Sequence, residues 1–302
     1  MVDKLKALAK DNGDRLAVVP IVRIEELQAE LANFCAKEKL NEYQKWIFDE
    51  VYRLENIPAH MQSVIIVAIP RPAYARATFV LNGKEYKAYA PVSTDIGRVD
   101  SYIEAAMKGA GYDTQKETRL PSKRIAVQSG LAEYGRNNIV YVEGMGSALA
   151  LRVYSTEMPC AKDAWRRPVV ATKCDTCELC IKKCPAGAIN HDNFLVNSEK
   201  CMVTWQQRDD DFPGWMPDTA HHTPYYCFMC QARCPMNADQ KIIESAFSEK
   251  ETARLLEGGP FDDVDADFGA RISLLMLDSR KQIPRNLRVL FDAMDRGHTP
   301  TL

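Results

Sequence analysis

The spacing of the cysteines constrains this chain more than any other feature. Eight of its ten cysteines fall between Cys174 and Cys234. The first four, at positions 174, 177, 180 and 184, are followed by Pro185 and form the run C-x2-C-x2-C-x3-C-P. A second unit has Cys201, a long insertion, and then cysteines at 227, 230 and 234 followed by Pro235. Two such units are typical of proteins that bind two [4Fe–4S] clusters.

The runs also predict how the ligands are shared. In two-cluster ferredoxins the fourth cysteine of each run binds the other cluster. We therefore expect one cluster on Cys174, Cys177, Cys180 and Cys234, and the other on Cys184, Cys201, Cys227 and Cys230. Paired C-x2-C units can also hold Zn²⁺, but a zinc ribbon needs no C-x3-C-P tail, so the pattern favours iron–sulfur. Cys35 and Cys160 lack ligand spacing and are expected to be small buried hydrophobic residues.

Composition indicates a reducing compartment. The chain has 302 residues, 39 Lys and Arg against 41 Asp and Glu, and a net charge of −2. Its N-terminus lacks the apolar core of a signal peptide, so the cysteines indicate reduced thiols in the cytoplasm. The apolar run at 63–69 is far shorter than the roughly 20 residues of a membrane span. We expect a cytoplasmic protein without membrane association. The near-neutral charge argues against a broadly basic surface that binds nucleic acid and leaves room only for a local basic patch.

Hydrophobic periodicity predicts alternating helices and strands before the cysteines. Helices are expected over 3–10 and 24–36, and strands over 16–21 and 63–69, the last buried on both faces of a sheet. Asp100 or Ser101 can cap a further helix, which Gly109 or Gly111 closes. Residues 138–143 and 148–154 are typical of a strand pair.

These elements predict an α+β protein in three parts. Residues 1–165 form an α/β domain for cofactor or substrate, 166–245 a bacterial two-[4Fe–4S] ferredoxin-like module, and 246–302 a short helical C-terminal extension. Apolar residues predict a helix at 242–247 and two more over 272–277 and 287–294. Because the first domain is too long for an adaptor loop, we expect it to hold the group that the clusters reduce.

The combined pattern resembles the cobalamin-dependent epoxyqueuosine reductases and, more distantly, the reductive dehalogenases. The matching stretches are 63–68, Tyr89-Ala90 with the 100–111 helix, 129–138, 155–159 and both cysteine units. Residues 129–138 are similar to the family's Gly-Leu-Gly-Trp-Ile-Gly-Lys-Asn element and make the resemblance specific. The resemblance implies an N-terminal domain that binds base-off cobalamin, which the clusters reduce to the Co(I) state that attacks the substrate.

The resemblance also implies a corrinoid pocket and a proton donor. The pocket would be formed by Tyr89, Gly130, Leu131, Tyr134, Gly135, Arg136, Asn137, Asn138, Val140, Tyr154 and Ser155. The glycines permit close backbone approach to a macrocycle, although plain turn chemistry accounts for them equally well. The family's proton-donating Asp has no counterpart in 116–124, which leaves Glu117, Tyr134 and Lys116 as candidate donors.

The substrate is expected to differ from that of the family. Epoxyqueuosine reductases continue into helical repeats that help to grip tRNA, whereas residues 284–290 resemble only the start of such a repeat. With a net charge of −2 as well, we expect a small-molecule substrate rather than tRNA. The electron donor would be a low-potential protein such as ferredoxin or flavodoxin. Two alternatives stay open: a corrinoid-free ferredoxin-like electron-transfer partner, and a reductive activator of a corrinoid protein.

The insertion between Cys201 and Cys227 is rich in aromatic residues and histidine. It contains Trp205, Trp215, His221, His222, Tyr225 and Tyr226. Such aromatic side chains can cover a pocket or shield a cluster from water. Adjacent histidines point apart, so we expect His221 and His222 at the surface rather than on a metal.

Overall fold

The computed structural model describes residues 1–52, 57–191, 194–238 and 240–302. The chain forms two compact units. The N-terminal unit comprises Met1–Pro70 and Asp95–Thr176, and the C-terminal unit comprises Arg71–Thr94 and Cys177–Leu302. These units divide the chain at other positions than the predicted boundaries at 165 and 245, and residues 246–302 lie in the same unit as most of the cysteines.

An antiparallel sheet in the order β1-β2-β8-β5 forms the centre of the N-terminal unit. Its strands are β1 (Arg15–Pro20), β2 (Ser63–Pro70), β8 (Leu149–Thr156) and β5 (Thr114–Glu117). All of β2 except its last residue is buried, because β-branched side chains fill both of its faces. The strand predicted at 63–69 is thus confirmed.

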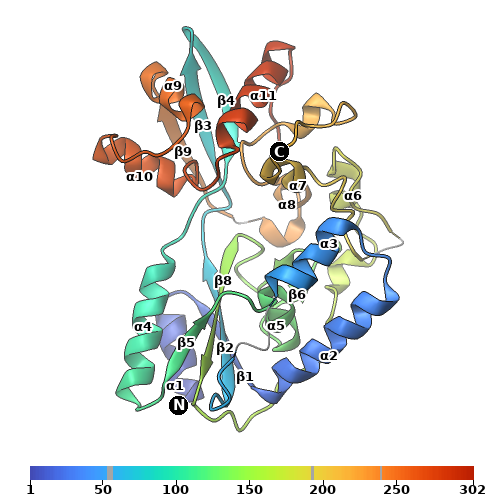
Figure 1. Cartoon of the computed structure of the whole chain (residues 1–302), viewed down its shortest axis with the longest axis vertical. Helices are drawn as coiled ribbons and strands as arrows, with labels where there is room; N and C mark the ends of the chain where they lie inside the picture. Colours follow the sequence, from blue (N-terminus) through green and yellow to red (C-terminus); the bar gives the residue numbers. More distant parts are fainter. Residues whose placement is uncertain (53–56, 192–193, 239) are drawn as a thin grey trace. The chain divides into compact units, whose positions relative to one another are not determined.

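Helices cover both faces of this sheet (Figure 1). Ile65 of β2 packs with α1 (Val2–Asp11) and α4 (Ile96–Gly109). The next residue, Ile66, packs on the opposite face with α2 (Val22–Lys37) and α5 (Ser122–Gln128). The helices predicted at 3–10 and 24–36 are confirmed. After α2 come α3 (Glu42–Trp46) and the π-helix η1 (Ile47–Val51).

Two predictions for this unit are wrong. α4 is capped by Asp95, whose carboxylate accepts a hydrogen bond from the Arg98 backbone, whereas the predicted cap Asp100 lies inside the helix. The strand pair predicted over 138–143 and 148–154 does not form. Instead β7 (Val140–Tyr141) pairs with β6 (Glu133–Tyr134), and β8 joins the large sheet because its apolar residues complete both cores.

The C-terminal unit contains a three-stranded sheet in the order β4-β3-β9. β3 (Tyr74–Leu81) and β4 (Lys84–Ala90) form a hairpin. Asn82 and Gly83 both adopt positive φ, 51° and 72°, as a two-residue type I′ hairpin turn requires. The hairpin had no counterpart among the predicted elements.

The segment predicted as a helix at 242–247 is the strand β9 (Ile242–Phe247), which pairs in parallel with β3. Phe247 stacks on Phe79 of β3 with 5.1 Å between ring centroids. The prediction failed because the apolar pairs in this short segment are compatible with both a helix and a strand. Pairing with a strand distant in the sequence selects the strand.

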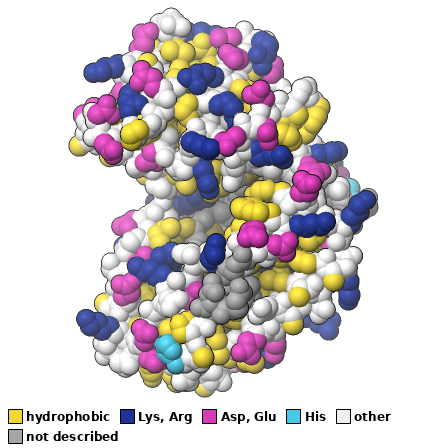
Figure 2. Space-filling model, in the orientation of Figure 1, with side chains coloured by type: hydrophobic (Ala, Val, Ile, Leu, Met, Phe, Trp, Pro, Cys, Tyr) yellow, Lys and Arg dark blue, Asp and Glu magenta, His cyan; other side chains and the backbone are white. Residues whose placement is uncertain are grey.

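Three helices pack on this sheet: α9 (Glu249–Glu257), α10 (Ala266–Leu274) and α11 (Ile283–Asp295). α11 confirms the helix predicted at 287–294. α10 overlaps only the start of the helix predicted at 272–277. No helix within the described residues is both long and apolar enough to cross a membrane. On the face seen in Figure 2, Lys and Arg side chains are interspersed with Asp and Glu.

Candidate functional site

Three thiols from distant segments lie near one another in the C-terminal unit, although no three Cys, His, Asp or Glu side chains among the described residues are grouped closely enough to hold a metal ion. Burial, followed by the neighbouring Cys201 and Cys184 thiols, raises the pKa of the Cys227 thiol to about 12. Burial and Cys184 likewise raise the pKa of Cys201. Like-charged groups shift one another's pKa in this way when they are close in space. Cys184 of the first run therefore lies near enough to Cys201 and Cys227 of the second for their charges to interact.

Short helices position these thiols. Cys184 follows α6 (Leu179–Lys183), Cys201 is the N-cap of α7 (Met202–Gln207), and Cys227 lies just before α8 (Met229–Ala232), which contains Cys230. α6 packs against α8. Pro185 cannot continue α6, so the helix ends at Lys183. Cys184 therefore lies outside the helix, on the segment that approaches the second run.

The Cys184 sulfur accepts a hydrogen bond from the backbone N–H of Ala188, at 3.2 Å. Hydrogen bonds to ligand sulfurs adjust the reduction potential of an iron–sulfur cluster. The loop after Pro185 thus supplies a donor to one of the predicted ligands.

The other predicted ligand set is divided between the two units. Cys174 ends the short helix η3 (Thr172–Cys174) in the N-terminal unit, and Cys177, Cys180 and Cys234 belong to the C-terminal unit. Arg136 donates from its guanidinium to the Cys174 carbonyl oxygen at 2.7 Å. The predicted corrinoid element therefore contacts the residue at which the cysteine run begins.

The two adjacent histidines are buried, which corrects the expectation that they lie at the surface. His221 is 4% exposed and His222 is fully buried. His222 Nδ1 lies 2.8 Å from the Ala220 carbonyl oxygen, and its Nε2 lies 3.2 Å from the Phe228 backbone nitrogen. A neutral ring that donates through Nδ1 and accepts at Nε2 satisfies both partners. Burial lowers its pKa to about 4, so His222 stays neutral and holds the backbone directly after Cys227.

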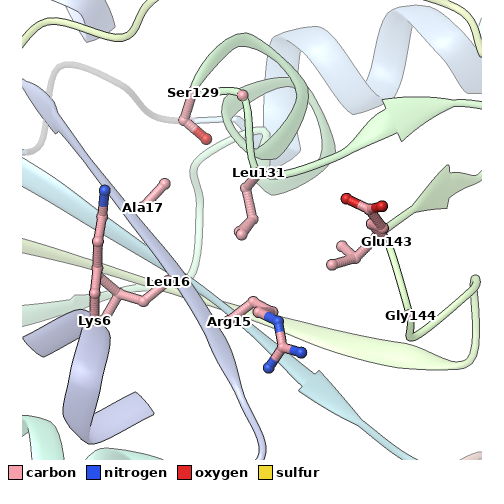
Figure 3. Close-up of a pocket in the computed structure, with 10 residues that line it drawn as sticks. Lys6, Arg15, Leu16, Ala17, Ser129, Leu131, Glu143 and Gly144 are labelled. Carbon is pink, nitrogen blue, oxygen red and sulfur yellow. The ribbon is translucent and has the colours of Figure 1, made fainter. Parts of the chain in front are cut away.

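A hollow of about 450 Å³ lies in the N-terminal unit, and the predicted residues Gly130 and Leu131 line it. Figure 3 shows Leu131, Arg15 and Glu143 around this space. Gly130 has a φ of 78°, and the first atom that a side chain would meet there is Arg166 Nε, 3.8 Å away. The first part of the predicted element thus borders an open space with charged groups of both signs.

The second part of the same element is engaged within the protein. A Cβ atom at Gly135 would lie 2.5 Å from Cε2 of Tyr141, so packing alone requires glycine there. The Asn137 side-chain amide donates to the Tyr141 hydroxyl at 3.0 Å. Lys123 Nζ donates to both the backbone and the side-chain oxygen of Asn138, each at 3.0 Å. These contacts account for the sequence of 135–138 without a ligand.

Two of the candidate proton donors point to opposite faces of the sheet. Glu117 is half-buried at the end of β5, and the fully buried Ser155 hydroxyl donates to its carboxylate at 2.6 Å. Burial raises the pKa of Glu117, and the Ser155 hydrogen bond partly opposes that shift. Lys116 forms ion pairs with Asp100 at 3.3 Å and Glu104 at 2.8 Å, and these carboxylates raise the pKa of its ammonium group.

Three further predicted residues are buried in the N-terminal unit: Tyr134, Val140 and Tyr154. Burial raises the pKa of Tyr134 to about 12. The Tyr154 hydroxyl donates to Asp100 at 2.6 Å, on the face that packs against α1 and α4. Tyr154 and Ser155 are neighbours in β8, so their side chains lie on opposite faces.

Tyr89, the remaining predicted pocket residue, lies on β4 of the C-terminal unit. Its ring meets Tyr74 edge to face at 5.3 Å, and Tyr74 lies 5.6 Å from the ring of Phe228. Its backbone N–H donates to the His222 carbonyl oxygen at 2.9 Å. Tyr89 is therefore part of an aromatic series that leads to the residue after Cys227.

Sequence reasoning missed several residues that shape these sites. Asp100 accepts hydrogen bonds from Arg152 and Tyr154 and joins Lys116 in a charged cluster. Arg15 and Glu143 line the hollow beside Gly130. Single charged residues of this kind have no local pattern, so only the fold brings them together.

Comparison with known proteins supports the prediction that the cysteines bind two [4Fe–4S] clusters. Residues 173–237 match a family described as a 4Fe-4S double cluster binding domain. Epoxyqueuosine reductase of Prochlorococcus marinus is 30% identical over 167 residues, which cover 54% of this chain and 50% of that protein. Tetrachloroethene reductive dehalogenase of Dehalobacter restrictus is 35% identical over 123 residues, which cover 40% of this chain and 21% of that protein. The matched regions thus span about half or less of these relatives.

Solved structures show the same fold. A selenomethionine-labelled epoxyqueuosine reductase has a TM-score of 0.70 at 17% identity, covering 96% of this chain and 81% of that one. An epoxyqueuosine reductase bound to an epoxyqueuosine-modified tRNA-Tyr stem loop has a TM-score of 0.67 at 16% identity, covering 97% and 82%. The predicted mixed α/β fold with its dicluster module is confirmed. The chain is similar in sequence to epoxyqueuosine reductases and, over a shorter stretch, to a reductive dehalogenase, and it contains a double-cluster iron–sulfur domain.

Proposed function

We propose that this protein is an iron–sulfur reductase in which two [4Fe–4S] clusters pass electrons to a corrinoid held by the N-terminal unit. The observation that carries the proposal is the spacing of the two cysteine runs, together with the packing of Cys227 on a small core that also contacts Ala186, two residues after Cys184. Exchange of the fourth cysteine between the two runs requires this arrangement. The match of residues 173–237 to a double-cluster domain supports the same reading, and reduced thiols suit a cytoplasmic location.

The residues of the N-terminal unit fit a corrinoid in part. Gly130 and Leu131 border the hollow of about 450 Å³, where Arg15 and Glu143 could meet the amide groups at the edge of a corrin ring. A corrinoid there would supply a cobalt centre that accepts single electrons. Residues 135–138 are already engaged by Tyr141 and Lys123, so we assign the contact to the first part of the element.

Glu117 is the proposed proton donor. A reductive step needs a group that can deliver a proton, and burial raises the pKa of the Glu117 carboxyl group, which favours its protonated form more than in an exposed carboxylate. Lys116 is tied to two carboxylates, and the Tyr134 ring lies within the hydrophobic core. Ser155 would orient the Glu117 carboxyl group through its hydroxyl.

The test is electron paramagnetic resonance of cob(II)alamin added to the anaerobically reconstituted protein. Binding in the base-off form should remove the nitrogen superhyperfine splitting of free cobalamin. Leu131→Trp, which fills the hollow, should restore the free spectrum, whereas Leu274→Trp at an exposed site of the C-terminal unit should not. A wild-type spectrum identical to that of free cobalamin would reject the corrinoid and favour a ferredoxin-like electron-transfer protein.

For the substrate we propose a small molecule rather than tRNA. The charge balance of −2 and the mixed charges on the face in Figure 2 support this choice, because phosphate contacts dominate affinity for nucleic acids. The electron donor would be a low-potential carrier of the ferredoxin or flavodoxin type.

A further inference from the structure

A second hollow, of about 620 Å³, lies entirely within the C-terminal unit. Its walls include Ala186, Lys200, Trp205, Arg208 and Trp215. This volume is in the range of small-molecule sites in proteins. None of the residues predicted for the corrinoid lines this space, and no step of the proposed function uses it.

The hollow borders the group of three thiols. Ala186 follows Cys184 by two residues, and Lys200 directly precedes Cys201. Ala186 and Trp205 also pack on a small core to which the Cys227 side chain contributes. A molecule in the hollow would therefore lie next to the cluster that we assign to these cysteines.

Two tryptophans make the hollow a stacking site. Trp205 and Trp215 meet edge to face with 6.4 Å between centroids and 82° between ring planes. Trp205 is fixed by its indole N–H, which donates to the Glu199 carbonyl oxygen at 2.7 Å, and by the Arg208 guanidinium 4.9 Å from its ring. Trp215 remains 51% exposed. An exposed indole beside a fixed one offers a face to a planar aromatic ligand.

Two cations, Lys200 and Arg208, and one carboxylate, Glu199, line the hollow, so its charged side chains carry a small positive excess. Arg208 is already paired with Asp210 at 2.9 Å. The Lys200 ammonium group has no ion-pair partner among the residues that the structure describes. A phosphate or carboxylate of the ligand would complete this pair.

We propose that this hollow binds a reduced flavin ring, which delivers electrons to the neighbouring cluster. The inference rests on the proposed function, because it takes the three thiols as cluster ligands. A [4Fe–4S] cluster accepts one electron at a time, and a flavin can release single electrons whereas a nicotinamide transfers hydride. In each step the anionic flavin hydroquinone loses one electron to become the neutral semiquinone, and the cluster is reduced from the 2+ to the 1+ state. No bond breaks, and no proton is transferred.

The flavin can be free FMN or can be presented at the surface of a flavodoxin, and the experiment separates these sources. Binding of oxidised FMN to the reconstituted protein is followed by quenching of flavin fluorescence. Cluster reduction by FMN hydroquinone, and separately by flavodoxin hydroquinone, is followed anaerobically by stopped-flow absorbance. Dithionite reduction reports whether the clusters themselves are intact.

The variants are Trp215→Ala and Lys200→Gln, with Trp46→Ala as the matched control. Trp46 is also 51% exposed but belongs to the N-terminal unit. Loss of one stacking contact should slow flavin-driven reduction about tenfold in Trp215→Ala, with a smaller loss in Lys200→Gln and none in Trp46→Ala. Dithionite reduction should be equal in all of them.

An effect with free FMN alone supports a site for the free cofactor, an effect with flavodoxin alone supports a site for the carrier's flavin, and an effect with both supports a site open to either source. Equal rates for Trp215→Ala and Trp46→Ala with both sources would overturn it. The proposed function fails separately, when dithionite finds no reducible clusters or when added cobalamin keeps its free spectrum.

Discussion

At the scale of single residues, Glu117 is the one carboxyl group among the three candidate donors, and its burial favours the protonated form. Burial raises the pKa of its carboxyl group, and the Ser155 hydroxyl acts in the opposite direction. The folded protein therefore binds this proton more tightly than the unfolded chain. The group's contribution to stability is fully present below the unfolded pKa of about 4.3 and is lost as pH rises through the folded pKa.

We predict that Glu117→Gln removes a carboxyl signal that titrates above the ordinary range of glutamate. Infrared difference spectra taken across a pH titration measure this signal, and Glu104→Gln serves as a control because Glu104 is an exposed carboxylate paired with Lys116. Ser155→Ala should move the signal to still higher pH, since the lost hydroxyl stabilised the carboxylate. If Glu117 donates the proton, its glutamine variant also loses about a hundredfold or more in turnover. A spectrum unchanged by Glu117→Gln would contradict the raised pKa.

At the scale of elements, the end of α6 bears on the predicted exchange of Cys184 between the two clusters. The helix stops before Cys184-Pro185, and the thiol then lies near Cys201 and Cys227. In a crossed arrangement these three cysteines serve one cluster, whereas in an uncrossed one Cys184 would serve the cluster of its own run.

We predict that Cys184→Ala lowers bound iron to about half, and that adding Cys227→Ala lowers it no further. In the crossed arrangement both changes damage the same cluster, while in the uncrossed arrangement the double variant would lose both. Iron and acid-labile sulfide analysis after anaerobic reconstitution gives the answer, with Cys160→Ala as the control. Near-complete loss of iron in the double variant would reject the crossed ligands.

The elements also show how far local sequence reaches. Four elements were predictable because their apolar residues follow a single pattern over many residues: β2, α1, α2 and α11. β9 was not predictable, because the apolar residues in its six positions are compatible with a helix or a strand. Pairing with β3, where Phe79 stacks on Phe247, decides for the strand. The β3–β4 hairpin had a usable signal, Asn82-Gly83 between two apolar runs. His221 and His222 are buried against the Phe212 ring and the Phe228 backbone respectively, and no local pattern predicts these contacts.

At the scale of the whole molecule, the chain passes between its two compact units three times, after Pro70, Thr94 and Thr176. The third passage separates Cys174 from the rest of its run. The cysteine motif was readable from spacing alone, since its ligands are set within a few residues. The predicted corrinoid pocket has no such local spacing, because its eleven residues lie in two units and on two faces of a sheet, and it stays a prediction.

The balance of charge over the whole chain leads to the last prediction, which concerns the substrate. A protein that neutralises several phosphates of a nucleic acid loses affinity steeply as the salt concentration rises. The slope of log affinity against log salt concentration is close to the number of phosphate contacts. A chain with a net charge of −2 and mixed surface charges should make few of them. We expect an epoxyqueuosine-modified tRNA-Tyr stem loop to bind weakly, with a shallow salt dependence and no preference over the unmodified loop. Fluorescence anisotropy of the modified and unmodified loops at 50 and 200 mM salt, about the range in which such contacts are lost, measures the affinity, its salt dependence and the preference. Tight, modification-dependent binding with a steep slope would instead assign this chain the tRNA substrate, because a local basic surface would then have to outweigh the net charge.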